Sequence, residues 1–352
     1  MQTEIFNLNH SNPDDPALTK CAEIIKNGGL VAFPTETVYG LGADATDAEA
    51  AKKIYAAKGR PSDNPLIIHI ADPADAERYA YTSELYYKLA EAFMPGPLTV
   101  ILKKKDVVPD GVTGGLPTVA VRCPSDETAR RLIQLSGTAI AAPSANRSGS
   151  PSPTCAEHVI ADLDSRIDAI LCGGACEIGL ESTIVEARED SLVLLRPGAI
   201  TADALRCVCD NVEIFHAVTE QLAENERPLS PGMKYRHYAP SVPLVLVEGE
   251  EDEVRLFLIN AQNSEKCALL CYHEETQYLR DERLIDIGAR EDLAVQASRL
   301  FAALRDADKL DCDVIYAHLP KKEGLGLALY NRLIRAAAHT VLHVDRTHHK
   351  KK

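Results

Sequence analysis

The chain has 352 residues, of which 45% are hydrophobic and 26% charged, a balance typical of folded domains rather than of disordered segments. This length is enough for about two domains. The formal net charge of -14 excludes a generally basic surface for nucleic-acid phosphates. With no tryptophan and only 5% aromatic residues, a stacking platform for single strands is also disfavoured.

The first residues predict neither a secreted nor a membrane protein. MQTEIFNLNHSNPDD has no basic start and no apolar core, and no segment approaches the length of a membrane span. The ten cysteines are scattered, without a CxxC pair or zinc-ligand spacing. We therefore expect a cytoplasmic protein with free thiols and no metal held by the protein itself.

Helix and strand signals alternate through the first part of the chain. Helices are predicted over 16–27, 47–58, 83–93 and 126–135, and strands over 30–34, 65–70, 98–104, 118–124, 138–146, 181–187 and 192–198. The segment TETVYGLGADA (35–45) is predicted to be a glycine-punctuated turn. Some neighbouring strands follow each other directly, so the pattern indicates an α/β domain with a mixed sheet.

A polar, proline-rich segment separates this part from a second one. Residues 217–243 are predicted to be an interdomain linker after a first domain of residues 1–216. Residues 244–345 alternate strands and helices again and predict a smaller, Rossmann-like domain. The last residues, 346–352, form a short basic tail that is predicted to be solvated.

The segment KGRPSDNPLIIH contains the first candidate site residues, Lys58, Arg60, Asn64 and His69. The two cations lie where a predicted helix ends and a buried strand begins. A lysine point charge beside a bidentate arginine suits a polyphosphate. The alternative is a helix terminus whose dipole favours cations, with a histidine satisfied within its strand.

A second candidate follows the strand that ends near residue 142. APSANRSGSPSPT (142–154) is rich in Ser, Gly and Pro, and it offers Ser144, Asn146 and Ser152 as donors. Such a loop after a strand suits a phosphate, although an ordinary surface turn has the same composition. No P-loop motif and no GxGxxG motif occurs, which argues against a P-loop NTPase and against NAD binding.

Three strands supply further polar residues. Thr118 and Arg122 lie four residues apart, on one face of their strand. Arg122 stands among apolar residues and needs a partner, either the carboxylate of a ligand or a structural ion pair. Ser182 lies in ESTIV and Arg196 in LLRPG, where an exposed cation is the alternative.

The linker contains a dense group of aromatic and cationic residues. SPGMKYRHYAP (230–240) includes Tyr235 and His237 and is interpreted as a segment that folds over a bound anion, with an interdomain contact as the alternative. No GxSxG or HExxH motif occurs. The candidate residues are mostly donors and cations, which indicates binding of an anionic transition state rather than carboxylate acid–base chemistry.

Together these segments resemble the threonylcarbamoyl-AMP synthase family in its two-domain Sua5 form. The matching segments are FPTETVYGLG (33–42), KGRPSDNPLIIH (58–69), MPGPLTVIL (94–102), VAVRCP (119–124), APSANRSG (142–149), ESTIV (181–185), LRPG (195–198), SPGMKYRHYAP (230–240) and GLGLALYNRLIRAA (324–337). The resemblance implies a YrdC-like twisted mixed sheet with a concave positive cavity, followed by a Rossmann-like Sua5 domain. It also implies that the 217–243 linker covers the active site.

The resemblance implies that L-threonine, bicarbonate and ATP give L-threonylcarbamoyl-AMP, pyrophosphate and water. A tRNA threonylcarbamoyl transferase complex would then modify adenosine 37 of tRNA, without stable tRNA binding by this chain. Catalysis is assigned to the tetrad Lys58, Arg60, Ser144 and Asn146. L-threonine is assigned to Thr37, His69, Arg122, Ala142 and Ser182. ATP is assigned to Lys58, Arg60, Asn64, Thr118, Ser144, Asn146, Ser152, Arg196, Tyr235 and His237. Mg2+ is expected to bridge phosphates, with no organic cofactor.

Two other functions fit parts of the sequence. A non-catalytic module for RNA binding or ribosome maturation would use a similar concave face, although the net charge of -14 weighs against it. A carbamoyl-adenylate former of hydrogenase maturation would use similar chemistry. Such proteins carry cysteine arrays of zinc-finger type, which this sequence does not have.

Overall fold

The computed structural model describes residues 2–8, 15–222, 226, 229–230, 238–280 and 282–345. The chain divides into two compact units, the first made of residues 1–148 and 152–235 and the second of residues 149–151 and 236–352. Tyr235, His237 and the predicted tail 346–352 lie outside the described residues. Within the described part, no helix is long and apolar enough to cross a membrane.

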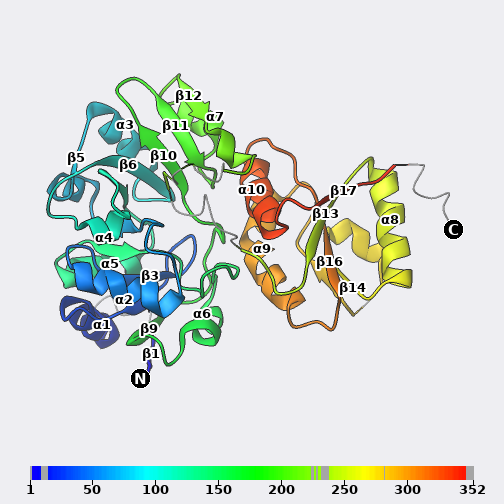
Figure 1. Ribbon diagram of the computed structural model, residues 1–352, viewed down its shortest axis with the longest axis horizontal. Coiled ribbons are helices and arrows are strands. Elements are labelled where there is room, and N and C mark those ends of the chain that lie inside the picture. Colours follow the sequence, from blue (N-terminus) through cyan, green and yellow to red (C-terminus); the bar gives the residue numbers. More distant parts are fainter. Residues whose placement is uncertain are drawn as a thin grey trace. The chain divides into compact units, whose positions relative to one another are not determined.

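The first unit is built on one large mixed sheet (Figure 1). Its strands are β1 (Glu4–Asn7), β2 (Val31–Phe33), β3 (Gly40–Asp44), β4 (Ile67–His69), β5 (Ala80–Tyr81), β6 (Leu98–Lys104), β7 (Thr118–Arg122), β8 (Ile140–Ala142), β9 (Ala169–Cys172), β10 (Thr183–Ala187), β11 (Leu192–Arg196) and β12 (Val212–Ile214). Their order is β1-β9-β2-β3-β8-β4-β7-β6-β10-β11-β12, and β5 pairs with β6.

The helices of the first unit are α1 (Pro16–Lys26), α2 (Ala48–Lys58), η1 (Pro73–Arg78), α3 (Glu84–Phe93), α4 (Asp110–Thr113), α5 (Glu127–Ser136), α6 (Ala156–Leu163), α7 (Ala202–Arg206) and η2 (His216–Val218). Local signals fix the ends of α2. The Asp47 carboxylate accepts a hydrogen bond from the backbone N–H of Glu49 at 2.8 Å. Gly59 ends the helix with φ +65°, a conformation that glycine adopts without a Cβ penalty.

Two apolar clusters cover the sheet. The first joins α1 and α5 to β2, β8 and β9, with Phe33 and Ile140 among its buried members. The second places Phe215, Ala217, Leu222 and Leu229, from the end of the unit, against β4, β6, β7, β10 and β11. The start of the predicted linker is therefore packed against the sheet.

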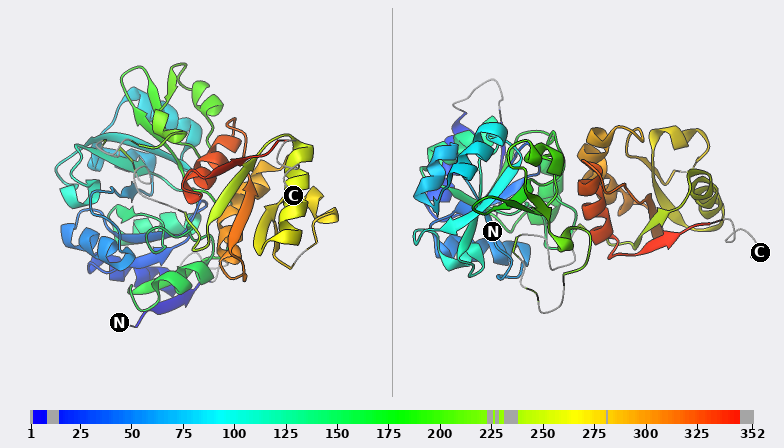
Figure 2. Two further views of the ribbon diagram at one scale, coloured as in Figure 1. Left: turned by 45° about the vertical axis from the view of Figure 1, so that its right-hand side comes forward. Right: turned by 90° about the horizontal axis from the view of Figure 1, so that it is seen from above.

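The second unit contains a five-stranded parallel sheet in the order β15-β14-β16-β13-β17. Its elements are β13 (Leu244–Glu248), α8 (Glu251–Ser264), β14 (Cys267–Cys271), η3 (His273–Gln277), β15 (Leu284–Asp286), α9 (Leu293–Ala307), β16 (Val314–His318), α10 (Gly326–Ala336) and β17 (Val341–His343). Figures 1 and 2 show α9 and α10 on one face of this sheet and α8 on the other. This layering is that of a Rossmann-like domain, so the predicted fold class is confirmed.

The prediction of a turn over 35–45 was wrong in its second half, because Gly40–Asp44 forms β3. The glycines there permit close packing. A Cβ on Gly42 would lie 2.7 Å from the Phe33 ring and 2.6 Å from Ile140, and one on Gly40 would lie 3.1 Å from Phe33. Glycine in this strand allows the aromatic ring to approach the backbone. The strand β9 and the helix α6 were not predicted.

A glycine beside β10 gives a test of this packing. A Cβ on Gly198 would lie 2.6 Å from the backbone nitrogen of Thr183 and 2.9 Å from the carbonyl oxygen of Glu181. Because backbone atoms cannot move aside cheaply, we expect Gly198→Ala to lower the free energy of unfolding by about 3 kcal/mol. At Gly137 a Cβ would meet no atom within 4 Å, and only the positive φ disfavours a side chain. We therefore expect Gly137→Ala to lower the free energy of unfolding by about 1 kcal/mol. Urea unfolding measures both, and equal losses would contradict the packing argument.

Candidate active site

The lysine at the end of α2 holds the loop that follows β8. Lys58 Nζ donates to the carbonyl oxygen of Ser144 at 2.5 Å, to the carbonyl oxygen of Asn146, and to Asn146 Oδ1 at 3.3 Å. Ser144 Oγ donates to Asn146 Oδ1 at 2.5 Å. The ammonium group is buried and is held by carbonyl oxygens. Three residues of the predicted tetrad are therefore directly bonded to one another.

The fourth tetrad residue, Arg60, lies just beyond the Gly59 cap. Its guanidinium donates to the carbonyl oxygens of Asn64 at 3.2 Å and Pro65 at 3.0 Å. These bonds fold the chain back between α2 and β4. The Asn64 side chain is buried, and its Oδ1 has no hydrogen-bond partner among the described residues. Lys58 thus holds the loop after β8, whereas Arg60 holds the segment that leads into β4.

The central strands carry the candidate residues at their two ends. His69 pairs in register with Arg122 on the parallel strand β7, and Arg122 pairs with Thr99 on β6. Paired residues point to the same face of a sheet. At the other end, Asn64 precedes β4, Thr118 begins β7 and Ser144 follows β8. Four strand steps separate Thr118 from Arg122, or about 13 Å, which is the length of an extended small ligand.

A buried ion pair occupies the first of these ends. Arg122 Nη2 lies 2.8 Å from Glu36 Oε1, and both side chains are buried. The atoms are at ion-pair distance but lack the alignment of a hydrogen bond, and both carboxylate oxygens of Glu36 and the Arg122 Nε remain unsatisfied. Burial, the largest single influence, would raise the pKa of Glu36, but the Arg122 charge and the nearby donor groups together outweigh burial and hold this pKa below its usual value. Of the two partners that the sequence allowed for Arg122, a ligand carboxylate or a carboxylate of the protein, the structure shows the second.

His69 is held neutral beside this pair. Burial lowers its pKa from the ordinary value of 6.5 to about 3, and the Arg122 charge lowers it further than Glu36 raises it. Its Nδ1 has no hydrogen-bond partner among the described residues. Phe33 meets the imidazole edge-on, with ring centroids 6.1 Å apart. His69 therefore offers a neutral donor or acceptor rather than a positive charge.

Two residues assigned to different substrates are bonded to each other. Arg196 donates from Nε to the carbonyl oxygen of Ser182 at 3.0 Å and from Nη2 to Ser182 Oγ at 3.1 Å. Ser182 Oγ also lies 2.7 Å from Thr99 Oγ1. Since Thr99 pairs with Arg122, this group lies at the same end of the strands as His69.

The remaining predicted residues are placed as follows. Ser152 Oγ donates to Glu181 Oε1 at 2.5 Å, with both residues buried. Thr37 Oγ1 lies 2.9 Å from Thr35 Oγ1 in the segment that carries Glu36. The Ala142 side chain belongs to the apolar cluster of α1 and α5, so only its backbone is available to a ligand.

Unsatisfied polar atoms concentrate in this region. Within the described part of the chain, buried side-chain atoms without a hydrogen-bond partner include atoms of Glu36, Asn64, His69 and Arg122. Buried polar groups are normally paired, because leaving one unpaired costs about 1–3 kcal/mol. Three adjacent exceptions at one end of the strands, with Asn64 at the other end, indicate a site whose polar groups are completed by a ligand.

Sequence reasoning missed two acidic residues of the site. Glu36 partners Arg122, and Glu181 accepts from Ser152. A signal for Glu36 exists, since an ionisable residue inside the apolar stretch FPTETVYG needs a buried partner. Nothing local identifies which distant strand supplies that partner.

Comparison with known proteins decides the family. The Sua5_yciO_yrdC family model, described as telomere recombination, matches residues 23–198, and the model of the threonylcarbamoyl-AMP synthase C-terminal domain matches residues 200–338. A Bacillus subtilis (strain 168) protein named threonylcarbamoyl-AMP synthase is 44% identical, over 94% of this chain and 95% of that protein. The chain belongs to the threonylcarbamoyl-AMP synthase family.

Other members of the threonylcarbamoyl-AMP synthase family are also similar to this chain over most of its length. A Pyrococcus abyssi member is 46% identical over 92% of this chain and 94% of its own length. The crystal structure of P. abyssi Sua5 complexed with L-threonine matches with a TM-score of 0.90 at 42% identity, covering 97% of this chain and 100% of that one. E. coli YciO, at 23% identity and a TM-score of 0.51, shares the fold of the first unit. The resemblance seen in the sequence is confirmed.

The low pKa of His69 makes a prediction about acid stability. Between pH 6 and 4 the imidazole of His69 binds a proton in the unfolded chain but not in the folded one. The contribution of neutral His69 to the free energy of unfolding is therefore complete above pH 6.5 and is lost as the pH falls toward 3. We expect His69→Gln to reduce the slope of unfolding free energy against pH by about 1.4 kcal/mol per pH unit in this window. Urea titrations from pH 4.5 to 8 measure it, and parallel slopes for the two proteins would contradict a neutral His69.

Proposed function

We propose that this chain is an L-threonylcarbamoyladenylate synthase, converting L-threonine, bicarbonate and ATP to L-threonylcarbamoyl-AMP, pyrophosphate and water. The observation that carries the proposal is the group of buried cations and unsatisfied polar atoms around β4, β7 and β8. Related proteins named threonylcarbamoyl-AMP synthase support it over nearly the whole chain. So does the P. abyssi relative, which was crystallised with L-threonine.

ATP binds at the end of the strands that carries Lys58, Arg60, Asn64, Thr118, Ser144 and Asn146. Lys58 supplies a fixed positive charge, and its bonds to Ser144 and Asn146 hold the loop in one conformation. Arg60 supplies a fork of donors for phosphate oxygens. Ser152 and Arg196 complete the ATP side, and Tyr235 and His237 join it from the linker.

Threonine binds at the other end. Arg122 receives the carboxylate of the amino acid, and Glu36 keeps the guanidinium oriented and balances its charge before the substrate arrives. Neutral His69, Thr37 and Ser182 bind the hydroxyl and amino groups, with the backbone of Ala142 nearby. Because Ser182 and Arg196 are bonded to each other, threonine meets the α-phosphate of ATP beside them.

The chemistry needs positioning more than an enzyme nucleophile. The threonine amine takes up CO2 from bicarbonate, with loss of water, to give an N-carboxylate. One oxygen of that carboxylate forms a bond to the α-phosphorus, while the bond from this phosphorus to the bridging oxygen of pyrophosphate breaks. Lys58, Arg60 and Arg196 stabilise the negative charge that accumulates on the phosphate oxygens, and the two strand ends hold the reacting groups in line.

Mg2+ accompanies ATP in this proposal. The described residues include no group of three or more His, Cys, Asp or Glu side chains that could hold a metal ion. Such an ion would take its ligands from phosphates and water, as Mg2+ does at many ATP sites, and would add charge neutralisation there.

Residues 217–243 cover the active site as a linker between domains of residues 1–216 and 244–345. Ala217, Leu222 and Leu229 pack against β4 and β7, the strands that carry His69 and Arg122, which supports this role. Tyr238, near the end of this segment, lies against Phe301 in a tilted arrangement with ring centroids 5.2 Å apart. The product passes to a tRNA threonylcarbamoyl transferase complex in the cytoplasm, without stable tRNA binding by this chain.

Removing the lysine charge tests the proposed function. We expect Lys58→Met to lower kcat/KM for pyrophosphate release about 10³-fold, because it removes a preorganised charge and releases the 144–146 loop. The assay supplies ATP, L-threonine and bicarbonate and detects pyrophosphate and the adenylate by mass spectrometry. Lys52→Met, on the exposed side of the same helix, is the control. Undiminished turnover in Lys58→Met, or adenylate formed without threonine, would refute the proposal.

The linker gives a second test. We expect the double variant Tyr235→Ala/His237→Ala to raise KM for ATP about tenfold while leaving the unfolding transition unchanged, since a covering segment retains substrate without forming the core. The control combines Tyr81→Ala and His343→Ala, which alter exposed side chains elsewhere. An unchanged KM would remove the linker from the site.

A further inference from the structure

A cavity lies in the unit of residues 149–151 and 236–352, at the carboxyl edge of its parallel sheet. It measures about 740 Å³, a volume typical of small-molecule sites. Residues that directly follow or end β13, β14 and β16 line it, among them Gly249, Tyr272 and His318. The function proposed above makes no use of this cavity.

The topology of the sheet favours a ligand at this place. The chain leaves β14 toward β15 and leaves β16 toward β17, and these two strands lie on opposite sides of the β14–β16 pair. The connections therefore diverge above the pair, which leaves a crevice at its carboxyl end. Ligands of parallel α/β sheets bind at such switch points.

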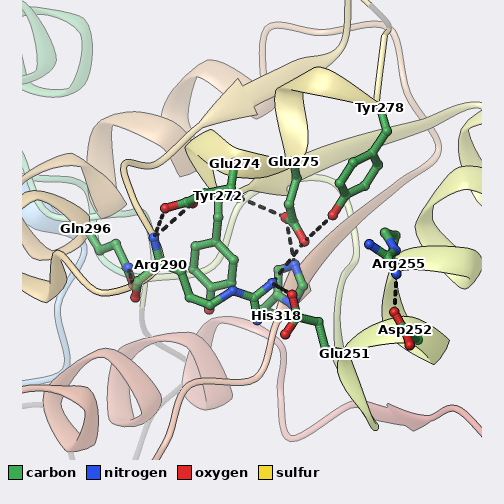
Figure 3. Close-up of polar contacts among 10 residues, drawn as sticks. All are labelled: Glu251, Asp252, Arg255, Tyr272, Glu274, Glu275, Tyr278, Arg290, Gln296 and His318. Atoms are coloured by element: carbon green, nitrogen blue, oxygen red, sulfur yellow. Dashed lines mark hydrogen bonds and ion pairs between the residues drawn. The ribbon is translucent and has the colours of Figure 1, made fainter.

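The floor of the cavity is rigid, and its arginine is already neutralised. Tyr272 stacks on His318 with centroids 4.5 Å apart, and the Arg290 guanidinium lies 4.7 Å from the Tyr272 ring. Figure 3 shows Glu275 bonded to His318, at 2.9 Å, and to Tyr278. Arg290 also lies 3.4 Å from Glu251 and 3.5 Å from Glu275. Its charge is thus shared between two carboxylates of the protein.

The rim, in contrast, carries carboxylates for which the described residues supply no ion-pair partner. Five glutamates line the cavity: Glu248, Glu250, Glu251, Glu291 and Glu323. Glu248 lies 2.7 Å from His343 and Glu251 pairs with Arg290, whereas no ion pair involves the other three within the described part of the chain. Lys321 is the other lining cation. The potential inside is therefore negative, and a phosphate would be repelled.

An acceptor on a largely buried side chain that lines the cavity suits a ligand that donates hydrogen bonds. Gln296 lines the cavity and is 4% exposed. Its Nε2 donates to the carbonyl oxygens of Ala289 at 2.7 Å and Arg290 at 2.9 Å. Its Oε1 has no donor among the described residues and is not sealed from solvent, so it can accept a hydrogen bond from a ligand in the cavity. The adjacent walls, Val254 and Leu293, are apolar.

We propose that this cavity binds a linear polyamine, a chain of ammonium groups joined by methylene spacers. The ammonium groups pair with Glu250, Glu291 and Glu323 and donate to Gln296 Oε1, while the spacers lie on the apolar walls. A metal ion does not fit, because no three acidic or histidine side chains of the described chain converge on one point. The volume also exceeds what a single ammonium ion fills.

Spermidine is the probe for this site, in isothermal titration of the full-length protein. We expect saturable binding of one spermidine per chain. The exposed triple variant Glu250→Gln/Glu291→Gln/Glu323→Gln should weaken it about tenfold, the factor that a few exposed ion pairs supply together. The control triple variant Glu91→Gln/Glu127→Gln/Glu213→Gln changes the net charge equally, at exposed positions of the other unit, and should stay within about twofold of wild type.

Equal losses in the two triple variants would assign binding to the diffuse negative charge of the protein and overturn the proposal, as would an absence of saturation. A chain that ends at Asp345 distinguishes the source of the ammonium groups. If removal of residues 346–352 tightens spermidine binding, the basic tail of this chain occupies the cavity and a free polyamine is not its ligand. Pyrophosphate release by the same variants should stay at the wild-type rate, so this test is independent of the proposed active site.

Discussion

The ion pair between Arg122 and Glu36 is the constraint on which the site depends. A guanidinium buried within a sheet is costly unless a carboxylate accompanies it, and Glu36 provides one from the segment between β2 and β3. The pair keeps Glu36 ionised in spite of its burial, lowers the pKa of the adjacent His69, and ties the FPTETVYG segment to β7. Because its hydrogen bonds are incomplete, the pair also leaves capacity for a ligand.

The parts of the structure that depend on neighbouring residues could be predicted from the sequence. Helix α2 ends at Lys58 because Gly59 follows it, and the apolar runs that became β6 and β7 were recognised. The parts that depend on residues far apart in the sequence could not be predicted in this way. Gly40 and Gly42 indicated a turn, but they serve the packing of Phe33. The strand β9 pairs with β1 and β2, far away in the sequence, and the partner of Arg122 could only be narrowed to a ligand or an ion pair.

The bonds of Lys58 give a physical reason for two sequence motifs to occur together. Lys-x-Arg and Ser-x-Asn are more than eighty residues apart, yet the ammonium group of Lys58 is held by the carbonyl oxygens of Ser144 and Asn146. These contacts are made to the backbone, so they constrain the course of the loop, whereas the Ser144 and Asn146 side chains bond to each other. The lysine is thus structural and electrostatic at once, because the same ammonium group holds the loop and supplies the positive charge.

Charge distribution distinguishes the two ligand sites that we propose for this chain. A net charge of -14 disfavours anions everywhere except where cations are fixed locally, and the first unit does this with Lys58, Arg60, Arg122 and Arg196, three of which are buried. In the second unit the arginine at the sheet edge is neutralised by Glu251 and Glu275, so the excess of rim carboxylates determines the field. If both proposals hold, a nucleoside triphosphate is rejected where a polyamine is attracted, and the reverse holds in the first unit. Each unit selects its ligand first by the sign of charge, and hydrogen-bond geometry refines that choice.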